Sequence, residues 1–257
     1  MLEFLFAVGL AWVNISANDL EQWTLIPQSQ WLPFANGVSL TYVFLEILPN
    51  LGSLQRQLEG DAWPVISHTD WSIYLPILLG ITVFYGMDML AQQPIQLTAA
   101  EQTSASKSKT ADRGSLKRPV FWLHIFAFAA YNGILGYLLQ SVLARQGFLD
   151  CLLFWVVLAL HVLLNDASLG DHYQTAYYTL GRWIMAFAVV VGTAVGGAVG
   201  GDARTELSAP AFLWAFVSGS ILFSGLAAAA RHSDHSFWAF FTGAAIYVSL
   251  LLLVATP

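Results

Sequence analysis

Long apolar runs are the feature that most restricts how this chain can fold. Seven stretches of about 20 mostly apolar residues follow one another, and this is the length that an α-helix needs to cross a bilayer. A segment in lipid must satisfy its backbone hydrogen bonds internally, so each stretch is predicted to be a helix. The predicted spans are residues 31–51, 71–91, 119–143, 148–166, 180–200, 210–230 and 236–255.

The composition agrees with a multi-pass membrane protein in contact with the lipid bilayer. Hydrophobic residues make up 57% of the chain and charged residues 10%, and the mean hydropathy is +0.62, as in polytopic helical proteins. We therefore predict an all-α integral membrane protein in which residues 1–257 form a single transmembrane domain. The sequence contains no basic stripe, so nucleic-acid binding is not expected.

Two segments differ from this pattern. Residues 1–17 are apolar but short for a span, and they lack the basic region and the A-x-A-like site of a cleaved signal peptide. They are predicted to form a truncated or re-entrant first helix, or a helix that lies at the membrane interface.

Residues 92–118 are rich in Ser, Thr, Ala and Lys and are predicted to be a flexible loop. This loop holds half of the ten Lys and Arg residues, which predicts a cytoplasmic location.

Polar residues inside the apolar runs are the candidates for function, because an ionisable group at a helix centre in lipid costs on the order of 2.5–3.5 kcal/mol. Glu46 lies in the first predicted span, Asn132 in the third, and His161, Asn165 and Asp166 in the fourth. His161 and Asn165 are four residues apart and therefore share one helix face. For each type of residue a purely structural role stays open as an alternative. The histidine is then a core residue bonded to a neighbour, the amides form hydrogen bonds between helices, and the carboxyl group is buried in its protonated form.

Motifs in these runs resemble those of the ZIP-type divalent metal transporters. The family's fourth-helix motif LHNxPEG is similar to AYNGILG here, in which Asn132 keeps its place while Tyr131 and Leu135 replace the His and the Glu. The fifth-helix motif, H-E-x-P-E-G or H-E-x-P-H-E, is similar to HVLLND, in which His161 is kept. The second-helix pattern AGV-x-L-x-x-x-FLHLLPE is matched at Gly37, Val38, Leu40, Phe44, Leu45, Leu48 and Pro49.

The resemblance implies a ZIP-like polytopic bundle without a cofactor, with zinc or another divalent cation as its substrate. It places the metal ligands among His161, Asn132, Asn165, Asp166 and Glu46. A dication in a low dielectric needs anionic ligands, and most of the family's ligands are replaced here. We therefore expect a permease with a degenerate metal centre or, alternatively, a non-transporting scaffold or sensor with the same fold. An enzyme is not expected, because no H-E-x-x-H, paired intramembrane Asp or G-x-S-x-G motif occurs.

Two further features carry predictions. His232, Asp234 and His235 are predicted to contact a cation at the inner mouth, although a solvated turn that caps the last helix is the favoured alternative. Glycines recur at intervals of four from Gly192 to Gly200, which produces a flat helix face. This face predicts close packing within the chain first and a homodimer second.

Overall fold

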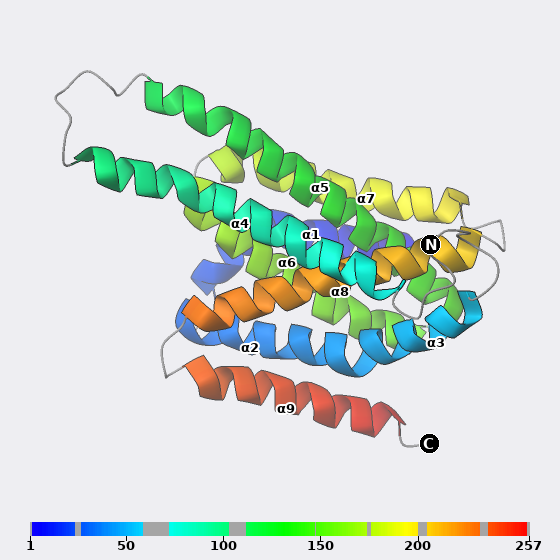
Figure 1. The fold of residues 1–257 in the computed structure, drawn as a ribbon. Coiled ribbons are helices and arrows are strands. Elements are labelled where there is room, and N and C mark those ends of the chain that lie inside the picture. Colours follow the sequence, from blue (N-terminus) through cyan, green and yellow to red (C-terminus); the bar gives the residue numbers. More distant parts are fainter. Residues whose placement is uncertain are drawn as a thin grey trace.

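Figure 1 shows the computed structural model of the protein, a bundle of helices that lie roughly along one common direction. The structure describes residues 2–23, 27–58, 72–102, 112–146, 148–173, 176–199, 205–231 and 236–255. Every regular element in these residues is helical, which confirms the predicted all-α class. The elements are α1 (Leu2–Trp23), α2 (Gln28–Tyr42), η1 (Val43–Ile47), α3 (Leu48–Leu58), α4 (Tyr74–Gln102), α5 (Asp112–Gln146), α6 (Phe148–Tyr173), η2 (Tyr177–Gly181), α7 (Arg182–Val199), α8 (Thr205–Arg231) and α9 (Ser236–Ala255).

Two of these elements, η1 and η2, are single π-helical turns within longer helices. The backbone keeps helical dihedral angles at Val43 and Leu48, so α2, η1 and α3 form one continuous helix. The same holds at Arg182, where η2 continues into α7. The described residues therefore form eight helical rods, which we name by their α-helices. Isolated π-helical turns occur often at functional sites.

The multi-pass prediction agrees with the length and composition of the described helices. Six of them are long and apolar enough to cross a bilayer: Ser29–Ser53, Pro119–Leu143, Phe148–Gly170, Tyr177–Val199, Pro210–Ala229 and Phe237–Val254. The prediction of seven such spans is not confirmed, because the apolar part of α4, Tyr74–Leu90, is shorter. α4 itself has 29 residues, since its helix continues past this apolar part to Gln102.

The predicted loop at residues 92–118 is helical at both of its ends. α4 continues to Gln102 and α5 begins at Asp112. The proposed boundaries were therefore wrong, because the Ala- and Gln-rich residues after 91 favour helix and extend α4. Residues 103–111 lie outside the described residues, and the cytoplasmic location stays a prediction.

The apolar N-terminal segment is an integral part of the bundle. α1 has 22 residues, which corresponds to about 33 Å of helix. The first helix is therefore not truncated. It packs along α6 and α7, with Ala7 and Leu10 fully buried. The Trp155 indole of α6 donates a hydrogen bond to the Phe6 carbonyl over 2.8 Å. Packing on two neighbours therefore buries a helix whose sequence alone is short for a span.

Consecutive rods run in alternating directions, as Figure 1 shows. Both chain termini lie at one end of the bundle, which we call the terminal end. The ends of α4 and α5 that border residues 103–111 lie at the other end, which we call the loop end.

The rods form two matching sets of three, with α5 and α6 as a central pair between them. One set consists of α1, α2 and α4, and the other of α7, α8 and α9. α1 packs against α6 as α7 packs against α5, and α2 packs against α9 as α8 packs against α4. α2 also contacts α6, and α8 contacts α5 in the same way. Matching rods run in opposite directions (Figure 1). These contacts and directions pair the rods as two inverted sets around α5 and α6.

Glycines at equivalent positions allow close helix contacts between the two sets. Gly37 and Gly243 lie where α2 crosses α9, and Gly80 and Gly219 lie where α4 crosses α8. At each of these glycines an added methyl group would overlap a backbone carbonyl of the other helix. Small residues of this kind are the usual means of close helix packing in membranes.

The small-residue face of α7 is covered by α5. A methyl group at Gly192 would overlap the Gly133 carbonyl, and one at Gly196 would lie 3.1 Å from the Tyr137 carbonyl oxygen. This contact is the packing within the chain that the sequence favoured for this face. Gly200 lies outside the described residues, and the homodimer stays a prediction.

Candidate functional site

A cluster of four buried side chains lies in the middle of the bundle. It consists of Tyr131 on α5, His161 and Asn165 on α6, and Ser220 on α8. Tyr131 Oη lies 2.9 Å from His161 Nε2, and the Asn165 amide nitrogen lies 3.2 Å from the same atom. The Ser220 hydroxyl lies 2.9 Å from Tyr131 Oη. The shared helix face predicted for His161 and Asn165 is thus confirmed.

The hydrogen bonds of the cluster converge on one nitrogen of the histidine. His161 Nε2 lies within hydrogen-bond distance of both Tyr131 Oη and the Asn165 amide nitrogen. The single hydrogen of the Ser220 hydroxyl can go to Tyr131 Oη or to the Val217 carbonyl, which lies 2.7 Å away. Two polar groups of the protein therefore surround Nε2. A metal ion could reach Nε2 only by displacing both groups. The geometry is that of a hydrogen-bonded core histidine.

Asn132 and Asp166 take part in other helix contacts. The Asn14 amide of α1 donates to Asn132 Oδ1 over 3.4 Å, and the Asn132 amide donates to the Phe128 carbonyl over 2.9 Å. Asp166 accepts a hydrogen bond from the Tyr177 hydroxyl of η2. These bonds join α1 to α5 and the end of α6 to the start of the next rod.

Glu46 lies on η1, toward the terminal end of the bundle. The charge of Asp150, near the start of α6, is close enough to act on Glu46. Along α6, Asp150 and Asn165 are separated by about 22 Å of helix axis, so Glu46 is remote from the Asn165 amide. The residues predicted at the inner mouth lie outside the described part of the chain: His232, Asp234 and His235.

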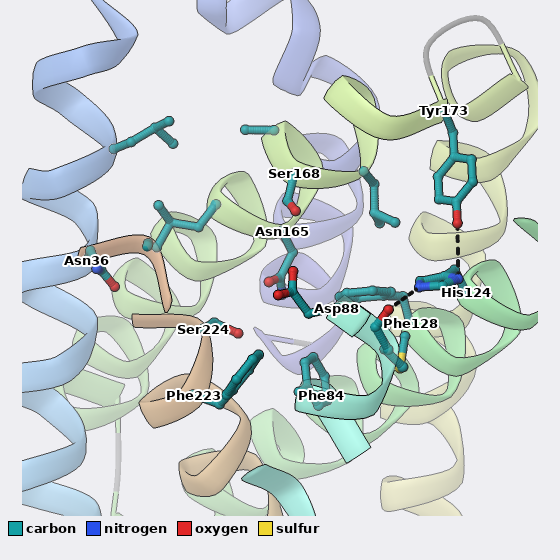
Figure 2. A pocket seen from close by; sticks show the side chains of 16 residues that line it. Asn36, Phe84, Asp88, His124, Phe128, Asn165, Ser168, Tyr173, Phe223 and Ser224 are labelled. Atoms are coloured by element: carbon teal, nitrogen blue, oxygen red, sulfur yellow. Dashed lines mark hydrogen bonds between the residues drawn. The ribbon is translucent and has the colours of Figure 1, made fainter. Parts of the chain in front are cut away.

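A cavity of about 280 Å³ lies next to the central cluster, on its loop-end side. Figure 2 shows the polar side chains around it. Asn165 belongs to both the cluster and the cavity, whereas the cavity lining does not include the other four predicted ligands. The polar lining residues are Asn36, Asp88, His124, Asn165, Ser168, Tyr173 and Ser224.

Asp88 and His124 line the cavity but are not among the candidates from the sequence. Both lie in predicted spans, so the rule that selects polar residues in apolar runs applies to them as well. Asp88 lies near the end of its predicted span, where contact with water is an adequate explanation. The antiparallel packing of α4 and α5 instead brings both side chains to one cavity (Figure 2).

His124 connects three helices through its two ring nitrogens. Nδ1 lies 2.8 Å from the Val120 carbonyl oxygen and 3.0 Å from the Tyr173 hydroxyl of α6. Nε2 lies 2.9 Å from the Met87 carbonyl oxygen of α4. Burial raises the pKa of Tyr173 to about 12, so this hydroxyl keeps its proton at neutral pH. Because both nitrogens already face protein oxygen atoms, His124 supports the cavity wall and does not offer a lone pair to a ligand.

The cavity therefore offers oxygen atoms to a ligand. They comprise the carboxylate of Asp88, the amide oxygens of Asn36 and Asn165, and the hydroxyls of Ser168 and Ser224. Among the residues that the structure describes, no group of three or more His, Cys, Asp and Glu side chains is close enough to hold a metal ion. Oxygen-only sets of this type suit hard cations better than zinc.

We expect Tyr131→Phe to destabilise the protein modestly. The variant keeps the ring but loses the bonds to His161 and Ser220, and each hydrogen bond between membrane helices is worth about 0.6 kcal/mol. The loss should be about 1 kcal/mol in the free energy of unfolding, measured in mixed micelles. A double-mutant cycle with Ser220→Ala should show positive coupling, and strict additivity would contradict the bond between the two hydroxyls.

Comparison with known proteins supplies no relative. The chain matches no model of a protein family, and neither the curated proteins nor the solved structures contain a significant match.

Proposed function

We propose that the protein is a ZIP-like membrane transport protein that moves a cation across the bilayer through the cavity shown in Figure 2. The observation that carries this proposal is the position of the cavity between the two inverted sets of helices. Its lining includes residues from α2 and α4 of one set, from α8 of the other, and from the central pair α5 and α6. Transporters with inverted repeats bind their substrates at such interfaces, near mid-membrane.

The lining chemistry favours a hard divalent cation. Asp88 supplies one negative charge, and amide and hydroxyl oxygens complete the polar surface. A cation with one protein carboxylate keeps part of its hydration shell, and the cavity volume of about 280 Å³ leaves room for several waters, each of which takes about 30 Å³ in the liquid. In this proposal α1 and α4 also cross the bilayer, and the central cluster of Tyr131, His161 and Asn165 closes the pathway toward the terminal end.

Uptake into proteoliposomes tests this function directly. The purified full chain is reconstituted, and entry of Mn²⁺, Ca²⁺, Mg²⁺ and Zn²⁺ is followed with dyes trapped in the lumen. We expect saturable entry of at least one hard cation, with zinc entering more slowly. Rates equal to those of protein-free liposomes for every ion would contradict the proposal.

Asn165→Asp is expected to strengthen cation binding in the cavity. A second carboxylate close to Asp88 should tighten Mn²⁺ binding by roughly tenfold or more, because one added unit charge at 4 Å is worth about 4 kcal/mol at an effective dielectric of 20 before desolvation is subtracted. Isothermal titration with Mn²⁺ measures the change. Asn132→Asp is the matched control, since Asn132 does not line the cavity. An equal gain in both variants would place the cation elsewhere.

A non-transporting scaffold or sensor is the second candidate, and one observation favours it. Leu135, Val162 and Val189 occupy the centre of the bundle with exposed fractions of 0%, 2% and 0%. Apolar side chains at these positions would keep water out of the centre of the pathway. If the protein binds Mn²⁺ in detergent but carries none into liposomes, the sensor function is the better description.

A further inference from the structure

Three aromatic rings form a layer on the terminal-end side of the cavity of Figure 2. The Tyr42 ring of α2 stacks on the Phe154 ring of α6, with centroids 5.8 Å apart and an interplanar angle of 26°. Tyr247 of α9 meets Tyr42 edge-on at 6.0 Å. All three side chains are buried, with exposed fractions of 7%, 1% and 4% for Tyr42, Phe154 and Tyr247. The layer therefore fixes the relative positions of α2, α6 and α9.

Two acidic residues lie one helical turn beyond this layer. Glu46 follows Tyr42 by four residues, and Asp150 precedes Phe154 by four residues. Residues four apart lie on the same side of a helix. α2 and α6 run in opposite directions (Figure 1), so a forward turn in α2 and a backward turn in α6 lead to the same side of the layer. The two carboxylates therefore lie on a common side of the aromatic rings.

Tyr247 provides a second, independent observation at this place. Its hydroxyl is buried and has no hydrogen-bond partner, although buried polar groups in proteins are almost always satisfied. The charges of Glu46 and Asp150 are both close enough to act on Tyr247. A buried hydroxyl without a partner beside two carboxylates indicates that a further group completes the site.

We propose that Glu46, Asp150 and Tyr247 form a second cation site, at the terminal end of the bundle. The two carboxylates hold the ion, and the Tyr247 hydroxyl donates a hydrogen bond to one of its waters. Oxygen ligands with two negative charges suit a hard divalent cation of the calcium type. Glu46 is half-buried and Asp150 is exposed, so the ion enters from solvent. The site does not depend on transport through the Asp88 cavity.

Terbium luminescence tests the site, because Tb³⁺ replaces Ca²⁺ at oxygen sites and is excited by nearby tyrosines. All measurements use the full chain with Asp88→Asn, in nanodiscs of phosphatidylcholine, so that binding in the Asp88 cavity does not contribute. We expect saturable tyrosine-sensitised emission that Ca²⁺ displaces. Glu46→Gln and Asp150→Asn should each weaken Tb³⁺ binding by at least about tenfold, which corresponds to one unit of charge lost from the site.

Tyrosine variants make the test specific to this site. Tyr247→Phe should lower the sensitised emission at saturation, whereas Tyr85→Phe, which changes an exposed tyrosine on α4, should not. Asp150→Asn carries the test even if Glu46→Gln fails to fold, because Asp150 is exposed. Unchanged Tb³⁺ affinity in Asp150→Asn would overturn the proposal and leave Tyr247 hydrated by water alone. That result would not affect the transport proposal, which the uptake assay tests separately.

Discussion

Gly192→Ala is expected to lower the melting temperature of the protein by roughly 10 °C. Gly192 lies where α7 crosses α5, and an added methyl group would overlap the carbonyl oxygen of Gly133. That oxygen belongs to a helix backbone and cannot rotate away as a side chain could, so the two helices must separate. Overpacking of this type costs about 3 kcal/mol, which is a large part of the stability of a typical domain.

Gly197→Ala is the matched control on the same helix. Its methyl group would meet only the side-chain nitrogen of Gln140, at 3.9 Å, which is ordinary contact. Alanine favours helix over glycine, so this variant should be as stable as the parent protein or slightly more stable. Cys151 is the only cysteine of the chain and is fully buried, so a thiol-reactive dye reports unfolding directly. Equal melting temperatures for the two variants would contradict the close α5–α7 contact.

Asp88→Asn is expected to reduce cation uptake into proteoliposomes at least tenfold. Asp88 is the only carboxylate among the residues that line the described cavity, so the variant removes the negative charge that compensates for lost hydration of the cation. A unit charge at 4 Å contributes about 4 kcal/mol at an effective dielectric of 20, which exceeds the 1.4 kcal/mol of a tenfold change. The amide has nearly the same shape, so the helix packing should be preserved.

Thr82→Val serves as the control for Asp88→Asn. Thr82 lies on the same helix, is exposed, and bonds only to the Leu78 carbonyl of its own helix among the contacts described. Its uptake rate should equal that of the parent protein. If Asp88→Asn transports at the parent rate while its melting temperature is unchanged, the cation does not pass through this cavity, and the transport proposal loses its site.

The spans of this chain follow from its sequence more completely than its candidate site does. Apolar runs identified the six helices that are long enough to cross a membrane, because length and hydropathy are local properties. α1 was judged too short, since the analysis could not include its burial against α6 and α7. The loop at residues 92–118 was placed with wrong boundaries because its composition is compatible with both helix and loop.

The candidate ligands separated into several places for a similar reason. His161 and Asn165 lie on one helix, and their spacing alone predicts that they meet. Whether Asn132, Asp166 and Glu46 meet the other candidate ligands depends on how different helices are rotated and shifted against each other. The structure pairs Asn132 with Asn14 and Asp166 with the Tyr177 hydroxyl.

The amino-acid sequence by itself determined that this chain is a helical membrane protein with polar residues buried in its middle. Both properties follow from local apolar length and from the cost of polar groups in lipid. Only the tertiary structure decided that His161 Nε2 is bonded to Tyr131 and Asn165 and that Asp88 shares a cavity with Asn165. The physical reason is that contacts between side chains on different helices depend on where the helices cross and how they are shifted along each other. Close glycine contacts between distant segments define these crossings.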